Sequence, residues 1–262
     1  MANGQLGGQN LTVECSRRAW RLTRQGISAA LGLLFPPVCT VCGRDVTEAS
    51  ETILVCSVCR AELTETRPTC LRCARPLPAE AGVGQHCPAC REKRFRFART
   101  TSLGTYGGVL RESVIRMKQA TNDALALSVG QLLAQRQQSI QVPDLISPVP
   151  MHWLRRLTRG VNCAEILGEV VGAKLRVPVA GDLLSCRRKT RKQGTLLPTE
   201  RRKNVRGAYA VSKGYDINGA QILVVDDVMT TGATANEIAR VLLRAGAAEV
   251  SVAVIARGIG FD

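Results

Sequence analysis

The stretch ILVVDDVMTTGAT, residues 222–234, runs from four aliphatic residues into two adjacent carboxylates and then into a small, hydroxyl-rich turn. Such an apolar run is typical of a central strand in a parallel sheet that is covered on both faces. Asp226 and Asp227 follow at its carboxyl end, which is the edge where these sheets bind ligands. The pattern therefore predicts an α/β fold with a binding site at this point.

The turn after the two acids is suited to holding an anion. Residues 230–234, TTGAT, lead into a predicted helix over 234–245, whose free amide groups point back at the loop. Because carboxylates repel phosphate, the acids must face another part of the same ligand, such as ribose hydroxyls or Mg²⁺. A sugar 5-phosphate in the loop, with its diol on the acids, is the arrangement that binds phosphoribosyl pyrophosphate. An acidic turn without a ligand is the alternative.

Aliphatic runs and helical patterns alternate along the rest of the domain, residues 100–262. Apolar residues at helical spacing predict helices over 109–117, 125–133 and 166–175. Short aliphatic runs predict strands over 145–150, 208–211 and 249–255. This alternation predicts a mainly parallel sheet with helices on both faces.

The cysteines form a repeat ahead of this domain. Four CxxC pairs occur within residues 36–94, and the last two pairs repeat the first two 31 residues later. Each unit has the spacing of a tetrahedral zinc ribbon with four thiolate ligands. A segment with so few large apolar residues would need metal for stability, so we expect two zinc ions. The predicted ligands are Cys39, Cys42, Cys56, Cys59, Cys70, Cys73, Cys87 and Cys90.

The pairing of these thiolates is open from the sequence. Ligation within each repeat is one arrangement, and a cross-braced one, in which the first and third pairs share an ion, is the other. Disulfides, redox-active CxxC sites and an iron–sulfur cluster explain the regular repeat less well. The remaining cysteines, Cys15, Cys163 and Cys186, are interpreted as free thiols.

The net charge of +15 favours polyanionic partners such as nucleic acid or phosphorylated sugars, and a basic surface that serves solubility alone is the alternative. No apolar run is long enough to span a membrane. Within the N-terminal segment, residues 1–35, the pattern over 16–35 predicts an amphipathic helix. We expect a cytoplasmic protein, because no cleavage site follows and paired cysteines suit a reducing compartment.

Residues 187–206 carry nine basic side chains and one acid, which is more than half of the excess positive charge. We interpret this segment as a flexible hood that closes over the site and neutralises the departing pyrophosphate. It could instead carry a nucleic-acid strand through phosphate contacts, or be a basic loop without a ligand. Eight of the nine cations, all except Arg206, are the candidate hood or nucleic-acid contacts: Arg187, Arg188, Lys189, Arg191, Lys192, Arg201, Arg202 and Lys203.

The sequence ILVVDDVMTTGAT resembles the signature of the type I phosphoribosyltransferases. From about Leu33 onward, the chain resembles the ComF family of competence proteins, which join a double zinc ribbon to such a domain. The resemblance includes LLFPPVCTVCG at 33–43, SPVPMHWLRRLTRGVN at 147–162 and TRKQGTLLPTERRKNVRGAY at 190–209. Val161 and Cys163 stand where the family usually has Phe and Gln, and Leu154 and Leu157 replace two frequent arginines.

The resemblance implies roles for individual residues. Asp226 and Asp227 would hold the ribose diol, with magnesium bound alongside the phosphoribosyl pyrophosphate. The turn at Pro150, with Arg155 and Arg159, would meet the pyrophosphate. The residues implied in binding the rest of this donor are Val228, Met229, Thr230, Thr231, Gly232, Ala233 and Thr234.

The resemblance also implies a setting in DNA uptake or in handling single-stranded DNA, with the uptake machinery as a partner. A base-salvage or biosynthetic transferase with structural ribbons is a second hypothesis, and a non-enzymatic nucleic-acid adaptor that senses phosphoribosyl pyrophosphate is a third. Thr230 stands where salvage enzymes for 6-oxopurines carry an acid, so the sequence leaves the acceptor unnamed.

Overall fold

The computed structural model describes residues 36–46, 53–82, 84–92, 95–119, 121–140, 142–152, 161–188, 190 and 198–259. The predicted amphipathic helix over 16–35 lies outside these residues. In chain order, the helices and strands are α2 (Ser57–Leu63), α3 (Pro88–Glu92), β1 (Thr100–Thr105), α4 (Gly108–Met117), α5 (Asp123–Gln138), β2 (Leu145–Pro148), α7 (Cys163–Leu175), β3 (Leu184–Cys186), α8 (Pro198–Val205), β4 (Tyr209–Val211), β5 (Gln221–Met229), α9 (Ala233–Arg244) and β6 (Glu249–Arg257).

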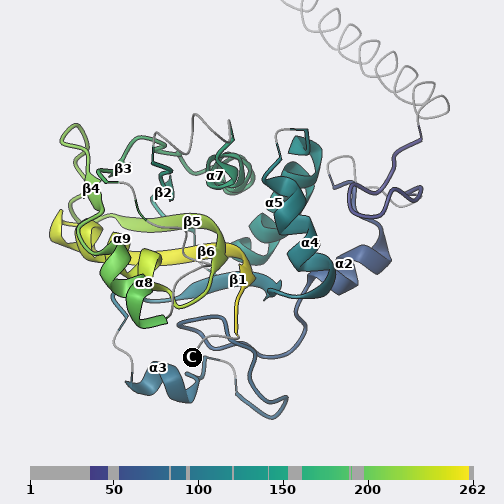
Figure 1. Ribbon diagram of the computed structural model, residues 1–262, viewed down its shortest axis with the longest axis horizontal. Coiled ribbons are helices and arrows are strands. Elements are labelled where there is room, and N and C mark those ends of the chain that lie inside the picture. Colours follow the sequence, from purple (N-terminus) through teal and green to yellow (C-terminus); the bar gives the residue numbers. More distant parts are fainter. Residues whose placement is uncertain are drawn as a thin grey trace, which may run out of the picture.

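A parallel sheet of four strands, in the order β1-β6-β5-β2, organises the molecule. The central strands β5 and β6 are nine residues long and mostly buried, as their aliphatic composition requires. Figure 1 shows α4, α5 and α7 to one side of this sheet and α8 with α9 to the other. Strands β3 and β4 form a separate antiparallel pair.

Successive residues of β5 and β6 feed two different cores, because side chains alternate across a sheet. Leu223 and Val225 join the core beneath α4, α5 and α7, and the first cysteine repeat packs into the same core. Ile222 and Val224 join the core beneath α9, and the second cysteine repeat packs there. The tandem repeats therefore lie on opposite faces of the sheet.

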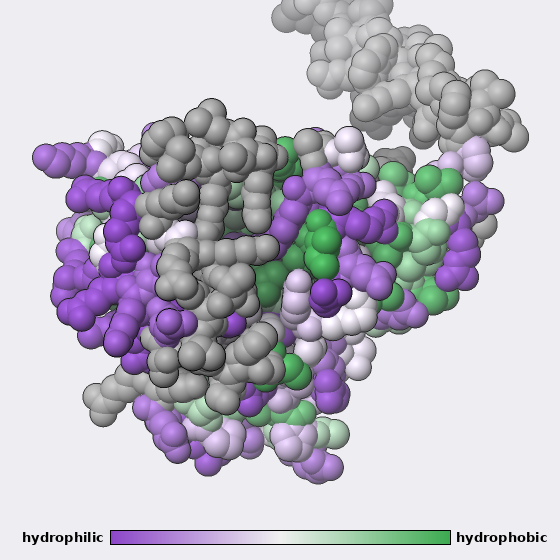
Figure 2. Space-filling model, viewed as in Figure 1, coloured by the Kyte–Doolittle hydropathy of each residue, from purple (hydrophilic) through white to green (hydrophobic). Residues whose placement is uncertain are grey.

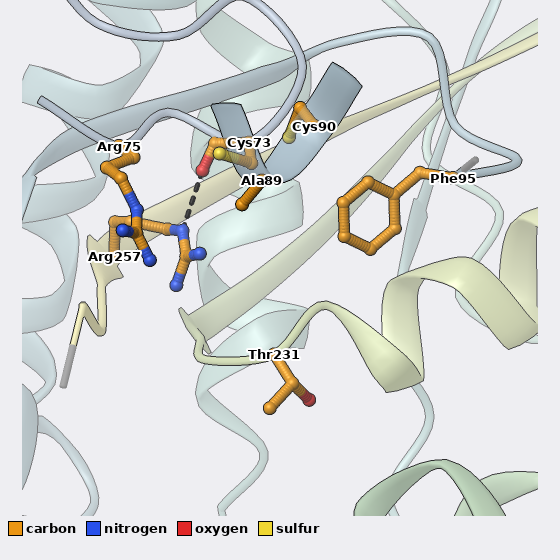
Figure 3. Close-up of a pocket in the computed structure, with 7 residues that line it drawn as sticks. All are labelled: Cys73, Arg75, Ala89, Cys90, Phe95, Thr231 and Arg257. Carbon is orange, nitrogen blue, oxygen red and sulfur yellow. Dashed lines mark hydrogen bonds between the residues drawn. The ribbon is translucent and has the colours of Figure 1, made fainter. Parts of the chain in front are cut away.

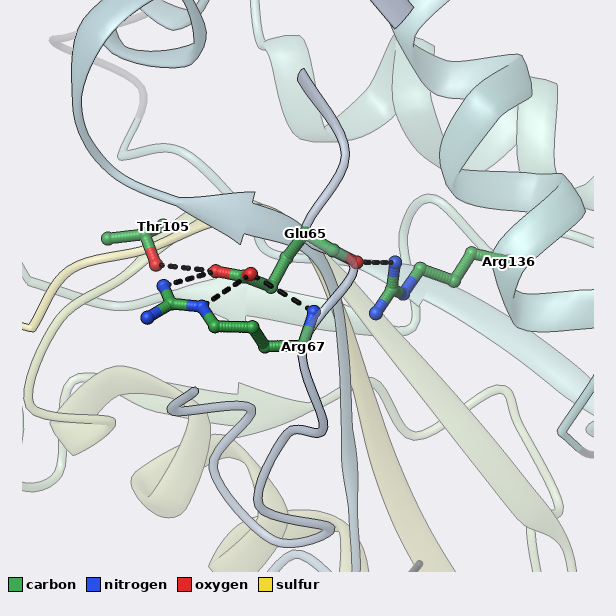
Figure 4. A network of polar contacts seen from close by, with 4 residues as sticks. All are labelled: Glu65, Arg67, Thr105 and Arg136. Atoms are coloured by element: carbon green, nitrogen blue, oxygen red, sulfur yellow. Dashed lines mark hydrogen bonds and ion pairs between the residues drawn. The ribbon is translucent and has the colours of Figure 1, made fainter. Parts of the chain in front are cut away.

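The segment between the repeats crosses the sheet at its β1 edge. The backbone N–H of Glu65 donates to the carbonyl oxygen of Leu103, 2.7 Å away, and that of Thr100 donates to Leu71 at 3.0 Å. Side chains fix the crossing further (Figure 4): the Glu65 carboxylate accepts from Arg67 and Thr105. The repeats thus cover an edge strand that would otherwise expose unpaired backbone groups.

The structure extends and corrects the expected elements. The sheet and the helices α4, α5, α7 and α9 are confirmed, but β1 and β3 were not predicted. Strand β5 runs through both acids to Met229, four residues beyond the expected strand end. Within the predicted flexible hood, Pro198–Val205 forms helix α8. Among the described residues, no helix is both long and apolar enough to cross a membrane.

Candidate functional site

The two acids lie in the last part of β5. Asp226 is held in place by its neighbour, because its Oδ1 accepts the backbone N–H of Asp227 at 2.8 Å. Desolvation by burial, together with the negative charge of Asp227, raises the pKa of Asp226 to about 8. A nearby cation, or hydrogen-bond donors such as sugar hydroxyls, would stabilise the ionised form of this buried carboxyl group. The acid pair is therefore poised for a polar, hydroxyl-rich or cationic ligand.

Lys118, directly after α4, belongs to the same site although no sequence motif indicates it. Its Nζ lies 2.7 Å from Oδ2 of Asp227. Burial works against the positive charge of Lys118, but the attraction of Asp227 and Asp226 outweighs it and raises the pKa of the lysine. No pattern around Lys118 could have indicated this pairing, because it depends on how α4 packs beside the end of β5.

The TTGAT segment contains the turn between β5 and α9 and the first two residues of the helix. Gly232 has φ +73°, a left-handed conformation that favours glycine, and the helix begins at Ala233. The Thr231 hydroxyl accepts the Ala233 N–H at 3.4 Å, and helix α9 presents its free N-terminal amides at this turn. A compact turn ahead of a helix of twelve residues is a suitable seat for a phosphate group.

The structure groups the eight CxxC thiols into two tetrads within the repeats, not across them. One tetrad is Cys39, Cys42, Cys56 and Cys59, and the other is Cys70, Cys73, Cys87 and Cys90; in each, all sulfur atoms lie within 4.8 Å of one another. A tetrahedral ion with Zn–S bonds of about 2.3 Å needs sulfur atoms about 3.8 Å apart. The Cys42–Cys56 and Cys73–Cys87 sulfur pairs, at 3.8 Å and 3.6 Å, fit this requirement.

Corresponding hydrogen bonds recur in the two tetrads. The Cys56 N–H donates to the Cys39 sulfur at 3.4 Å, and the Cys87 N–H donates to the Cys70 sulfur at 3.2 Å. In the first tetrad, hydrogen bonds from Arg44 also lower the pKa of the Cys42 thiol to about 6, which favours the thiolate that zinc binds. Both tetrads thus have the donor set and geometry of a structural zinc site.

The predicted pyrophosphate and hood residues are only partly described. Pro150 follows β2, which lies beside β5 in the sheet, whereas Arg155 and Arg159 are outside the described residues. Lys189, Arg191 and Lys192 are also outside them. Of the eight candidate contacts, those that are described and exposed are Arg187, Arg188, Arg202 and Lys203.

Arg201 differs from the other predicted hood cations. It is only 1% exposed, because helix α8 turns it toward the protein interior. Arg188 is also engaged, since its Nη2 donates to the carbonyl oxygens of Asn204 and Arg206 at the end of α8. The expectation that these cations lie on one flexible loop is therefore wrong for Arg201, Arg202 and Lys203, which are on helix α8, and of these Arg201 is buried.

Comparison with known proteins shows which family the chain belongs to. The sequence matches the double zinc ribbon domain over residues 30–94 and the phosphoribosyl transferase domain over residues 157–260. Competence protein F of Haemophilus influenzae is 30% identical over 181 residues, which cover 66% of this chain and 79% of that protein. The chain belongs to the ComF family. Another relative, DNA utilization protein YhgH of Salmonella typhimurium, is 31% identical over 187 residues, or 69% of this chain and 81% of that protein.

The ComF assignment confirms the predicted double zinc ribbon and type I phosphoribosyltransferase fold. Among solved structures, glutamine phosphoribosylpyrophosphate amidotransferase of B. subtilis is similar, with a TM-score of 0.33 and 22% identity. That match covers 54% of this chain and about a quarter, 26%, of the amidotransferase chain. The fold assignment rests on the family match and the observed parallel sheet.

Proposed function

We propose that this ComF-family protein binds phosphoribosyl pyrophosphate with magnesium at the end of β5. The observation that carries the proposal is the position of Asp226 and Asp227 at the carboxyl end of a central parallel strand, next to the turn that opens α9. The loop over 230–234 would seat the 5-phosphate, and the acid pair would hold the ribose diol or the magnesium ion. Lys118 would release Asp227 when the ribose diol or the magnesium ion binds.

Calorimetric titration with phosphoribosyl pyrophosphate and Mg²⁺ tests this site. The Asp226→Asn, Asp227→Asn double variant keeps the shape of both side chains but cannot ionise when the ligand binds, so we expect binding to weaken by about a hundredfold or more. The matched control is Asp45→Asn, Asp123→Asn, which removes two exposed acids elsewhere and should bind like the wild type. Equal binding by the wild type and the site variant would contradict the assignment.

We propose further that the protein acts on or with single-stranded DNA. The names of the relatives, which refer to competence and DNA utilization, support this proposal, and so does the exposed basic surface around α8. Figure 2 shows predominantly hydrophilic residues over α8, α9 and β4, on the left of that view. Phosphate contacts from such cations would give sequence-independent binding that weakens steeply with salt.

Fluorescence anisotropy with a labelled single-stranded oligonucleotide tests the DNA proposal. Arg202→Glu, Lys203→Glu should weaken binding and reduce its salt dependence. Arg111→Glu, Lys174→Glu reverses two exposed charges on α4 and α7, and should have a smaller effect. Equal losses in both double variants would indicate non-specific attraction to a basic protein and would contradict a site at α8.

The match to the phosphoribosyl transferase domain also supports a second candidate, a transferase that acts on a nucleobase or an amine. Pyrophosphate release in a screen of such acceptors would favour it. Binding of phosphoribosyl pyrophosphate without release, for every acceptor in the screen, would favour an adaptor that senses this metabolite.

A further inference from the structure

The second ribbon is joined to the β5–α9 loop by one buried arginine. Arg257 ends β6, is 4% exposed, and lies between the two (Figure 3). Its Nε donates to the carbonyl oxygen of Cys73 at 2.7 Å. Its Nη1 donates to the carbonyl oxygens of Met229, at 3.2 Å, and of Thr230 and Gly258. A single guanidinium thus links a predicted zinc-ligand residue to the backbone where the loop begins.

The chain that leaves the second ribbon makes a separate contact with the same loop. Phe95 and Phe97 stack with their ring centroids 4.8 Å apart. A Cβ atom on Gly232 would lie 3.2 Å from Cε1 of Phe95 and 3.5 Å from Cζ of Phe97. Directly beside them, the Arg96 N–H donates to the Asn236 side chain of α9 at 2.7 Å. The segment that follows the second ribbon therefore forms one wall of the loop and of the helix start.

The cavity between these groups is too small to hold a ligand that Arg257 would bind. It measures about 10 Å³, roughly the space of one water molecule, and Arg75 and Arg257 line it beside Cys73 and Cys90. One Zn²⁺ held by four thiolates carries a net charge of about −2, which two adjacent guanidinium groups would balance. Arg257 is thus suited to a buried position next to a zinc ion bound by four thiolates.

The first ribbon is anchored in a comparable way, but to a different element. Arg116 of α4 donates to the carbonyl oxygens of Val41 and Thr40, at 2.6 Å and 2.9 Å. These bonds hold the first cysteine knuckle on the opposite face of the sheet, against the core beneath α4 and α5. Arg116 therefore provides a matched control: it anchors a ribbon through backbone carbonyls and leaves the β5–α9 loop untouched.

We propose that Arg257 is a positioning residue that couples metal binding in the second ribbon to the conformation of residues 230–234. With the metal bound, the Cys73 carbonyl is fixed and Arg257 is held between it and Thr230. Without the metal, the guanidinium loses one of its anchors and the loop loses the wall formed by Phe95 and Phe97. The value of this coupling for phosphate binding rests on the proposed function of the loop.

Amide hydrogen exchange on the full-length, zinc-loaded protein tests the coupling without any ligand. Arg257→Met keeps most of the side-chain volume and removes the donors, so we expect exchange in residues 230–234 to become about tenfold faster. Arg116→Met should change exchange in this loop by less than about twofold. Arg257→Lys retains the charge but cannot donate to both sides, so an intermediate rate is expected. Equal loop exchange in the wild type and Arg257→Met would overturn the proposal.

Two further measurements separate the coupling from the proposed function. Arg257→Met should keep the zinc content of the wild type and bind phosphoribosyl pyrophosphate about tenfold more weakly. If the wild type does not bind this compound, the proposed function fails, whereas the exchange comparison still decides the coupling. Cys73→Ser should accelerate loop exchange and Cys42→Ser should not; the reverse result would overturn the proposal. If Cys73→Ser does not fold, the Arg257→Met comparison decides alone.

Discussion

The two ribbons are copies of one cysteine pattern with nearly the same hydrogen bonds, but their surroundings differ. In the first, Cys42 is exposed and Cys56 is half-buried, whereas all four thiols of the second are buried. The first packs on the side of α4, α5 and α7, and the second packs beside α9 and the candidate phosphate loop. The face of the sheet on which a repeat lies, and not its cysteine spacing, therefore decides how closely it is tied to the site.

The largest difference in stability between the two ribbons should come from substituting a metal ligand at equivalent positions in each. Cys42 and Cys73 close the first CxxC pair of their repeats, but only Cys73 is buried. We expect Cys73→Ser to lower the free energy of unfolding by roughly 4 kcal/mol or more, because it opens a metal site inside a packed core. Cys42→Ser should cost clearly less, as measured by urea unfolding of both variants.

Zinc analysis provides the control for this pair of substitutions. The wild type should contain two zinc ions per chain, since each tetrad has a complete set of four thiols. A content of one zinc would contradict the equality of the repeats, and equal destabilisation by the two serine variants would contradict the difference between their surroundings.

A smaller effect should come from adding one methyl group to the loop. Gly232→Ala combines a φ of +73° with a Cβ contact of 3.2 Å to Phe95, and we expect a loss of about 2 kcal/mol in stability. Gly219 has almost the same φ, +75°, with nothing within 4 Å of a Cβ. Gly219→Ala should therefore cost only about 1 kcal/mol, the conformational part. Thermal unfolding measures both, and equal costs would show that Phe95 does not restrict a side chain at residue 232.

The smallest effect should come from the segment that separates the ribbons. Hydrogen bonds from Arg67 hold the pKa of Glu65 below its ordinary value, so the ionised carboxylate stabilises the folded state. This contribution is present above the unfolded pKa of about 4.5, and is lost as pH falls through the lower folded pKa. Glu65→Gln should cost less than about 1 kcal/mol at pH 7, because Arg67 is largely exposed.

Urea unfolding at pH 7 and pH 3 checks the sign of this prediction. The stability difference between the wild type and Glu65→Gln should shrink at the lower pH, because the wild-type carboxylate takes up a proton as pH falls through its lowered folded pKa. A difference that grows on acidification would contradict the role of the ionised group. Glu65→Gln should keep its zinc at pH 7, since Glu65 is not a member of either tetrad.

Much of the fold could be predicted because its strongest patterns are local. The aliphatic run before Asp226 and the helical spacing in α4, α7 and α9 indicate buried faces without reference to any partner. Strand β1, TTSLGT, escaped prediction because it is short and rich in small polar residues. It is buried through pairing with β6 and through the segment between the ribbons, both distant in sequence.

In the candidate site, too, the features with a local sequence pattern could be predicted and those that depend on tertiary packing could not. Cysteine spacing predicted the eight ligand thiols but left their pairing open, and the order of acids, threonines and glycine predicted the β5–α9 loop. Lys118 and Arg257 could not be predicted, because a single cation carries no spacing pattern and its role depends on tertiary packing. The same limit explains Arg201: its position in a basic run suggested a surface charge, whereas the orientation of α8 buries it.

Arg257 and Cys73 are 184 residues apart in the sequence, and this separation has a consequence for synthesis on the ribosome. Both ribbons leave the exit tunnel and can acquire metal long before β6 is made. The central strand β5 cannot gain its second neighbour until β6 arrives, because β6 is the last strand of the sheet. The nascent chain therefore carries both ribbons ahead of an open sheet, and Arg257 can contact the loop only after β6 has been made.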